Sequence, residues 1–399
     1  MKEIHSPKFF GTLLFLLNFL VMMDYLVMVP LVMDISRTLG LAPTRTGFLL
    51  SSYPIAAALS SLLLAPFSDR LGRKKMTLFL LAGFSLASLG VALSTEVWQI
   101  FLFRILSGVF GGPVLPNSFA FAGDTFKGED RGRIIANLSL SFSAASIFGV
   151  PMGAWIGSWL GWQGVFGMIS LLSLLGLIPF LALPSVPTQA EGKILSQYRQ
   201  LLGLWALKPV QLAFGLQFLM LIGLFGVVPN IAVWFSTNYG YDAGQIALCY
   251  MQGGIGAVLG NRLAGEFLKR RLRRGLISGG SLVMALFLGV ACSEWVPDPP
   301  LGLFFAGMMF GGSIRVPVHQ LNLSELLPIQ FRGRLMSMNT IVGHLAMGLG
   351  GFWSSPLLHI EGGHLYGMQT IGLVGVGALC LVPWIALAFG RSTRHQTVY

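Results

Sequence analysis

Among the ionisable side chains within long apolar stretches of this sequence are Asp24, Arg104 and His344. A charge in such a stretch is costly unless it faces a cavity or a partner. A carboxyl group there can take up and release a proton, and an arginine that pairs with it in only one conformation couples that exchange to movement. We therefore predict Asp24, Arg104 and His344 as proton-coupling residues. The alternative interpretation is structural: Asp24 stays paired with Arg104 or an amide, and His344 is simply hydrogen-bonded.

A second polar group is predicted on one helix face. Arg315, His319 and Asn322 follow at i, i+4 and i+7, and Arg315 precedes Glu325 by ten residues, which is roughly 15 Å along a helix. Arginine binds carboxylate and phosphate through two parallel hydrogen bonds. Together with Arg104, this face favours an anionic substrate. A buried pair that only steadies the structure is an equally open interpretation.

Further polar and aromatic residues within apolar stretches are predicted to line a substrate cavity with Arg315 and His319. These are Tyr25, Asn117, Asn137, Gln217, Asn230, Trp234, Gln252 and Asn339. Many apolar neighbours and 17 methionines suit a pocket that adapts to amphipathic compounds.

The apolar stretches that carry these residues fill nearly the whole chain. Of 399 residues, 54% are hydrophobic and only 10% are charged, against about 25% charged in soluble domains. A helix that crosses a membrane needs about 20 apolar residues. We predict twelve such helices, at 8–34, 42–68, 74–94, 97–124, 131–159, 162–183, 210–236, 243–265, 275–294, 300–325, 333–356 and 366–390.

The chain contains an internal duplication. In residues 124–133 and again in 325–334, an acid ends an apolar stretch and Arg-Gly-Arg opens the next, and the pair Gly111 and Gly112 recurs as Gly311 and Gly312. Parallel repeats of this size indicate a two-halved transporter. We predict an N-terminal six-helix bundle over 1–184, a cytoplasmic linker with a short amphipathic helix over 185–209, and a C-terminal six-helix bundle over 210–399.

The distribution of charge predicts the orientation. Lysines and arginines cluster at one end of the twelve segments, with only Arg37 and Arg45 at the other end, although the net charge is +11. Both termini are therefore predicted to be cytoplasmic by the positive-inside rule. Because the basic residues border membrane segments, nucleic acid is not predicted as a partner.

The loop after the second segment carries the most specific motif. Residues 65–75 read Ala-Pro-Phe-Ser-Asp-Arg-Leu-Gly-Arg-Lys-Lys. This resembles the Gly-x3-Asp-Arg-x-Gly-Arg-Arg/Lys pattern of the major facilitator superfamily, with Ala65 in place of the opening glycine, and the resemblance covers essentially all twelve segments. It implies an all-α integral membrane fold of two pseudo-symmetric six-helix bundles. It also implies a conformational latch, formed by Asp69, Arg70, Gly72, Arg73 and Asp124, with Glu325, Arg332 and Arg334 as the counterpart in the second half.

A second resemblance concerns the fifth segment. Residues 149–157 and 161–163 read Gly-Val-Pro-Met-Gly-Ala-Trp-Ile-Gly and Gly-Trp-Gln. They are similar to the signature of arabinose-efflux-type permeases, in which an arginine usually stands at Gln163. The similarity implies a twelve-helix drug:proton antiporter, in which the Arg-x-x-x-Gly pattern of Arg104 is associated with proton transfer. Physically, the small residues form a flat ridge for helix packing and the proline introduces a kink; the residues concerned are Gly149, Pro151, Gly153 and Gly157.

We predict a secondary active transporter that exports small amphipathic drugs or metabolites against protons by alternating access. One alternative is an importer or exchanger of organic anions that uses Arg104, Arg315 and His319, and another is an uncoupled membrane receptor or scramblase. No nucleotide-binding, hydrolase or metalloprotease motif is present, and the three cysteines lack metal-site spacing. We therefore predict no enzyme activity, cofactor or metal. The expected partners are a small-molecule substrate, protons and the lipid bilayer, for a monomer in the cytoplasmic (inner) membrane.

Overall fold

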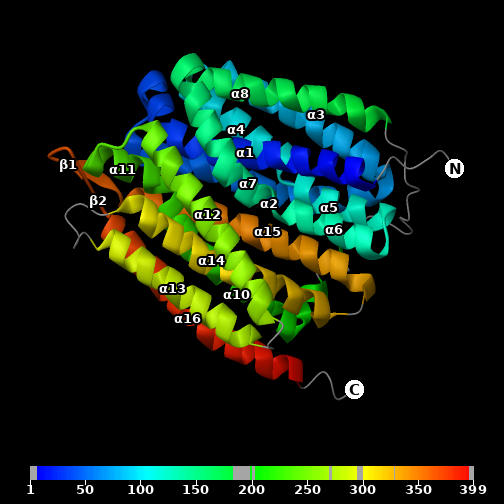
Figure 1. Cartoon of the computed structure of the whole chain (residues 1–399). Helices are drawn as coiled ribbons and strands as arrows, with labels where there is room; N and C mark the ends of the chain where they lie inside the picture. The colour runs from blue at the N-terminus through cyan, green and yellow to red at the C-terminus, as the bar shows by residue number, and fades with distance from the viewer. Residues whose placement is uncertain are drawn as a thin grey trace. The chain divides into compact units, whose positions relative to one another are not determined.

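The computed structural model describes residues 7–182, 198–199, 203–268, 272–293, 300–327 and 329–394. Helices make up most of these residues (Figure 1). Among them, the only sheet is a two-stranded antiparallel hairpin of β1 (His359–Glu361) and β2 (His364–Tyr366). Gly362 and Gly363 form its tight turn with positive φ angles of 57° and 81°, which glycine adopts without steric cost.

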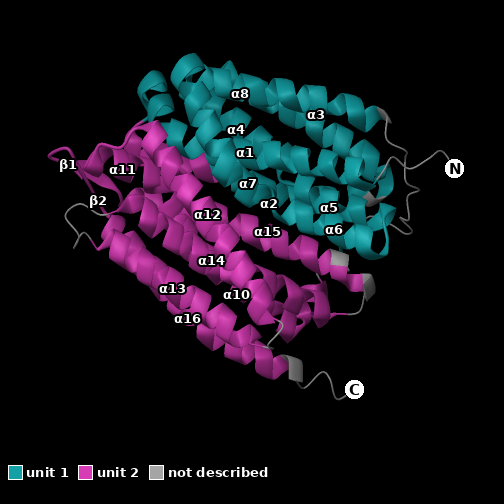
Figure 2. Cartoon of the chain, viewed as in Figure 1, with its two compact units in different colours: residues 1–41, 52–198 teal, residues 42–51, 199–399 magenta. Residues whose placement is uncertain are grey.

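The described residues fall into two compact units (Figure 2). Unit 1 comprises residues 1–41 and 52–198, and unit 2 comprises 42–51 and 199–399. The boundary between them passes through α2, whose first turns belong to unit 2, where the Phe48 ring lies 5.3 Å from that of Phe352. Most of the predicted linker lies outside the described residues, which include only Tyr198, Arg199 and 203–209 of that part of the chain.

The helices of the first half of the chain are α1 (Pro7–Leu39), η1 (Pro43–Arg45), α2 (Thr46–Leu71), α3 (Arg73–Ala92), α4 (Val97–Gly111), α5 (Val114–Thr125), α6 (Gly128–Ser139), α7 (Ser141–Ala144), a π-helical turn (Ala145–Gly149) and α8 (Val150–Ala182). The α8 stretch contains a break at Gly161, whose φ of 66° is not helical. Two of the predicted segments therefore run through α6 to α8.

The helices of the second half are η3 (Leu204–Ala206), α10 (Lys208–Val227), η4 (Val228–Asn230), α11 (Ile231–Tyr239), α12 (Ala243–Leu268), α13 (Arg273–Cys292), α14 (Leu301–Leu326), α15 (Ile329–Ser354), η5 (Ser355–Leu357) and α16 (Met368–Arg394). Nine helical stretches among the described residues are long and apolar enough to cross a membrane. One of them, Gly128–Leu181, has 54 residues and contains the Gly161 break. Together with α12 and α15, these stretches match the twelve predicted segments.

Exposed side chains on the outer helices are largely apolar. On α8, Trp155, Trp159 and Leu160 are each about two-thirds exposed or more, and on α16 Trp384 is 73% exposed. In a protein surrounded by water such large apolar surfaces are rare. They fit helices that face lipid, in agreement with the all-α membrane fold predicted from the sequence.

Candidate functional site

Asp24 and Arg104 form a buried ion pair in unit 1. Arg104 Nη1 lies 2.6 Å from Asp24 Oδ2, and both side chains have no exposed surface. The hydroxyl of Ser88 on α3 donates to Asp24 Oδ1 at 3.2 Å. The pair therefore connects α1 with α4 within the membrane-spanning part of the unit, where breaking it would leave an uncompensated charge.

The remaining surface of the Arg104 guanidinium lies among aromatic rings. Its Cζ atom is 5.0 Å from the ring centre of Tyr53 and 5.8 Å from that of Phe166, within the range of cation–π attraction. Nε and Nη2 of Arg104 have no hydrogen-bond partner in the described part of the chain. The guanidinium thus keeps two donors available beside the one that holds Asp24.

Glycine explains why Tyr53 and Arg104 lie so close. A Cβ atom on Gly108 would lie 2.3 Å from the Tyr53 carbonyl oxygen, and one on Gly111 would lie 2.4 Å from the Tyr53 hydroxyl. Only glycine permits this approach of α4 to α2. The Arg-x-x-x-Gly spacing therefore has a local purpose, since the glycine one turn after Arg104 admits the aromatic residue that packs on it.

The predicted glycine ridge packs against the helix that carries Asp24. Cβ atoms on Gly149, Gly153 and Gly157 would contact Met23, Val27 and Leu31 of α1, respectively. The π-helical turn immediately precedes Val150 and Pro151. Proline lacks a backbone N–H, which accounts for the irregular turn at the position where the kink is predicted.

One end of unit 1 contains the predicted latch. Gly72 separates α2 from α3 with a φ of 84°, and Arg73 Nε lies 2.8 Å from Asp124 Oδ2. Arg73 also donates to Ser68 Oγ at 2.8 Å. Arg70 is exposed, and the Asp69 side chain lies outside the described part of the structure.

Asn117, a predicted cavity residue, bonds residues next to the Arg73–Asp124 pair. Its Oδ1 accepts a hydrogen bond from Ser68 at 2.7 Å, and its Nδ2 donates to Thr77 Oγ1 at 2.8 Å. Of the other predicted cavity residues in unit 1, Tyr25 stacks near Tyr53 with ring centres 5.2 Å apart. Asn137 is exposed on α6. Ser88, Tyr53 and Phe166 surround the pair but were not predicted, because hydroxyl and aromatic residues are common in apolar helices.

The acceptors that bond Arg315 within the described part of unit 2 are all neutral. Arg315 is 2% exposed, and it donates to the carbonyls of Gly312 and Met220, to Ser281 Oγ at 3.2 Å and to Met284 Sδ at 2.9 Å. No carboxylate pairs with it among the described residues. Its charge is therefore held by dipoles and a polarizable sulfur, in contrast to Arg104.

Some of the other predicted residues of unit 2 have hydrogen-bond partners and some have none among the described residues. His319 Nε2 is 3.0 Å from Asn339 Oδ1, which links α14 to α15. Asn230 donates to Ser354 Oγ at 2.8 Å, and the indole N–H of buried Trp234 has no partner among the described residues. His344 Nδ1 is likewise buried without a partner in the part of the chain described.

The second latch differs from the one predicted. Both carboxylate oxygens of Glu325 bond the guanidinium of Arg273, one of them at 3.0 Å. Arg332 instead donates to the Leu327 carbonyl at 3.4 Å, and Arg334 forms no ion pair with Glu325. The physical reason is that α13 begins at Arg273 beside the end of α14, whereas Arg332 and Arg334 follow the turn into α15.

The comparisons with known proteins agree with this architecture. The family model described as Major Facilitator Superfamily matches residues 14–351. The chain belongs to the Major Facilitator Superfamily. Members of this family are transporters and not enzymes, in agreement with the absence of enzymatic motifs. The coarse prediction of an integral membrane transporter is therefore confirmed.

Individual relatives extend over most of the chain. It is 28% identical over 365 residues to the uncharacterized MFS-type transporter YwfA of Bacillus subtilis (strain 168), an alignment that covers 88% of this chain and 84% of YwfA. Its fold resembles that of a D-xylose-proton symporter, with a TM-score of 0.78, 18% identity, and coverage of 94% and 97%. The human organic anion transporter MFSD10 has a TM-score of 0.72 at 16% identity, with coverage of 96% and 99%. At these identities the solved structures establish the fold alone.

Proposed function

We propose that this protein is a proton-coupled antiporter of the drug:proton type, which exports small amphipathic compounds by alternating access. The observation that carries the proposal is the Asp24–Arg104 pair at 2.6 Å with no exposed surface. A proton taken up by Asp24 removes one charge of this pair. The free-energy difference between the conformation in which Asp24 and Arg104 are paired and one in which they are apart then changes by several kcal/mol. This is enough to bias a conformational equilibrium.

The surroundings of Arg104 support its role as the switching partner. Two of its nitrogens have no partner in the described structure, so the guanidinium can form new hydrogen bonds when Asp24 is protonated. Tyr53 and Phe166 retain it by cation–π contacts when the carboxylate no longer does. In this proposal the protein resides in the inner membrane as a monomer, with both termini in the cytoplasm, as the positive-inside rule favours.

The test is proton movement in proteoliposomes with a weakly buffered lumen and a pH dye. Cationic, neutral and anionic solutes are added to wild type, Asp24→Asn and Asp24→Glu. Asp34→Asn is the matched control, because Asp34 lies on the same helix but is exposed and paired at 3.7 Å with Arg37. We expect solute-dependent proton movement in wild type, Asp34→Asn and, at reduced rate, Asp24→Glu. Equal solute and proton fluxes in wild type and Asp24→Asn would reject the proposal.

A second candidate function is exchange or import of organic anions. Arg315 favours it, because its described partners are all neutral and its buried charge has no counter-ion among them. An anionic substrate would supply one, with His319 as a further donor. Anion uptake that survives Asp24→Asn but is lost in Arg315→Gln would favour this function over proton-coupled export.

A further inference from the structure

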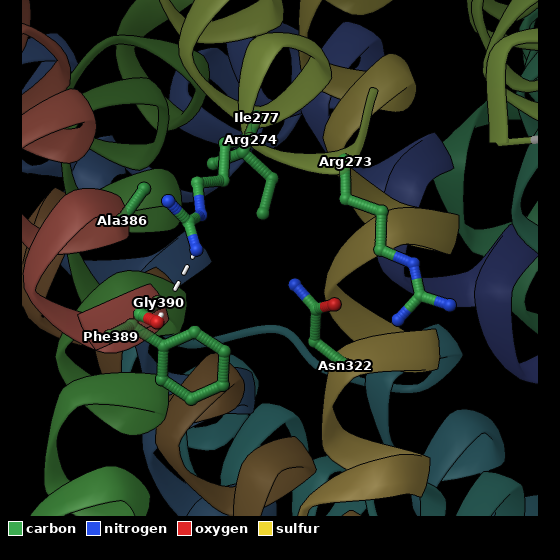
Figure 3. Close-up of a pocket in the computed structure, with 7 residues that line it drawn as sticks. All are labelled: Arg273, Arg274, Ile277, Asn322, Ala386, Phe389 and Gly390. Carbon is green, nitrogen blue, oxygen red and sulfur yellow. Dashed lines mark hydrogen bonds between the residues drawn. The ribbon is translucent and has the colours of Figure 1, made fainter. Parts of the chain in front are cut away.

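A cavity of about 190 Å³ lies in unit 2 among the ends of α13, α14 and α16. Arg273 and Arg274 stand on two sides of it, and the Asn322 amide is directed into the space between them (Figure 3). Ile277, Ala386 and Phe389 provide apolar walls. The cavity therefore combines two cations and an amide with a surface suited to hydrocarbon, and Arg315 is not among the residues that line it.

The positive charge of Arg274 is not neutralised by the described residues. Its Nη2 donates to the Gly390 carbonyl at 3.3 Å, which is a long bond to a neutral acceptor. Arg273, in contrast, is committed to Glu325 through both carboxylate oxygens. Asn322 forms no hydrogen bond within the described part of the chain. One cation and one amide thus remain available to a ligand.

The position of Arg274 depends on a glycine. A Cβ atom on Gly390 would lie 2.5 Å from Arg274 Nε and 2.6 Å from its Cζ. Arg274 is an exposed residue, and its guanidinium lies against bare helix backbone at the wall of the cavity.

The sequence that leads into α13 is the most basic of the chain. Lys269, Arg270, Arg271, Arg273 and Arg274 fall within six positions. The corresponding loop of unit 1 has Asp69 where this one has Lys269. A run of this density near a membrane surface attracts anionic lipid headgroups, at about 1 kcal/mol per cation.

We propose that this cavity binds the phosphate headgroup of an anionic phospholipid from the surrounding leaflet. Arg274 and Asn322 donate to the phosphate oxygens, Arg273 adds a second positive charge, and the acyl chains lie along the helices beside Ile277 and Phe389. The apolar walls favour a lipid over a free anion, because they offer nothing to an ion without a hydrocarbon part. The lipid belongs to the cytoplasmic leaflet in the predicted orientation, and the site does not depend on proton coupling.

The experiment follows thermal unfolding of the full-length protein in mild detergent. Phosphatidylglycerol is titrated into it, with phosphatidylcholine as the neutral comparison and inorganic phosphate as the soluble anion. A ligand that binds only the folded state raises Tm as its concentration increases. We compare wild type with Arg274→Gln, and with Arg262→Gln as the matched control, since Arg262 is an exposed arginine of the same unit outside the cavity.

We expect phosphatidylglycerol to raise Tm in wild type and Arg262→Gln, and Arg274→Gln to weaken the apparent affinity about fivefold or more. An equal response of Arg274→Gln and wild type would overturn the proposal. So would a rise produced by inorganic phosphate alone at the same phosphate concentration, because the cavity would then bind a soluble anion.

If Arg274→Gln does not fold, Asn322→Ala provides the test, since it removes one donor and no charge. Phosphatidylglycerol retained on the protein is then counted by native mass spectrometry. Retention in Asn322→Ala equal to wild type would overturn the proposal, and a reduced count would support it.

Discussion

The two units place different chemistry on their second and fourth helices. In unit 1, Arg104 of α4 lies 5.0 Å from the Tyr53 ring of α2. In unit 2, the residue of α14 that lies against Tyr250 of α12 is Phe305, with ring centres 4.8 Å apart. The tyrosine ring thus packs against an arginine guanidinium in unit 1 and against a phenylalanine ring in unit 2. The duplication preserved the helix contact and changed the charge within it.

The latches show the opposite relation. Arg73 pairs with Asp124 and Lys74 donates to the Leu181 carbonyl in unit 1. Arg273 pairs with Glu325 and Arg274 donates to the Gly390 carbonyl in unit 2. Each unit therefore uses one cation to bind an acid and the next to hold the end of its last helix. The contacts at the helix ends are thus similar in the two units, whereas the buried charges differ.

Asp24→Asn is expected to have the largest effect. It leaves Arg104 buried without a charged partner, so the free energy of unfolding should fall by about 3–5 kcal/mol, and proton-coupled transport should stop. Thermal or denaturant unfolding in detergent measures the first effect. The double variant Asp24→Asn/Arg104→Met should recover part of the stability but no transport. A single variant as stable as wild type would mean that the pair is not a strong link between α1 and α4.

Glycine-to-alanine substitutions test how closely the first and fifth membrane helices pack in each unit. A Cβ on Gly350 would lie 2.5 Å from the Phe225 backbone carbon, whereas one on Gly153 would meet the Val27 side-chain atom Cγ2 at 2.3 Å. Backbone cannot move aside as a side chain can, so Gly350→Ala should cost about 3 kcal/mol and Gly153→Ala about 1 kcal/mol. Gly132→Ala, which has open space around it, is the control. The reverse order in unfolding measurements would show that α8 is the more rigid contact.

Arg315→Met should change stability by less than about 1.5 kcal/mol. No carboxylate is left behind among the described residues, so the variant leaves no uncompensated buried charge and loses only hydrogen bonds to neutral acceptors. Arg104→Met should lower the stability more than Arg315→Met, because it leaves Asp24 buried without its cation. Equal losses of Tm in the two variants would indicate that Arg315 has a charged partner after all.

The smallest effects are expected from the two latches. Arg73 and Asp124 have side chains 19% and 40% exposed, against 37% and 51% for Arg273 and Glu325. Exposed ion pairs contribute about 0–1 kcal/mol. Arg73→Gln should therefore cost about 1 kcal/mol, since it also loses Ser68, and Arg273→Gln should cost less. If chemical unfolding gives the larger loss for Arg273→Gln, burial does not set the strength of these latches.

Some of the site was accessible to sequence reasoning and some was not. Asp24 and Arg104 stand out because ionisable residues are rare in apolar helices, the loop motif contains Arg73, and the family resemblance implies Asp124 as its partner. The counterpart latch was predicted to consist of Glu325, Arg332 and Arg334, although Arg273 lies 200 positions after Arg73 and was open to prediction from the repeat. The second loop lacks the Asp-x-x-Gly spacing, which concealed that correspondence.

Sequence by itself determined the membrane class, the twelve segments, the duplication and the family resemblance, since hydropathy and short motifs are local properties. It indicated Arg104 as a partner of Asp24, but it did not determine that Arg315 has neutral partners among the described residues or that Asn117 bonds Ser68 and Thr77. These outcomes depend on which face each helix turns to its neighbours, and that is decided by close contacts such as Gly108 against Tyr53. Packing is a property of whole helices in space, so only the tertiary structure specifies which buried charges are paired.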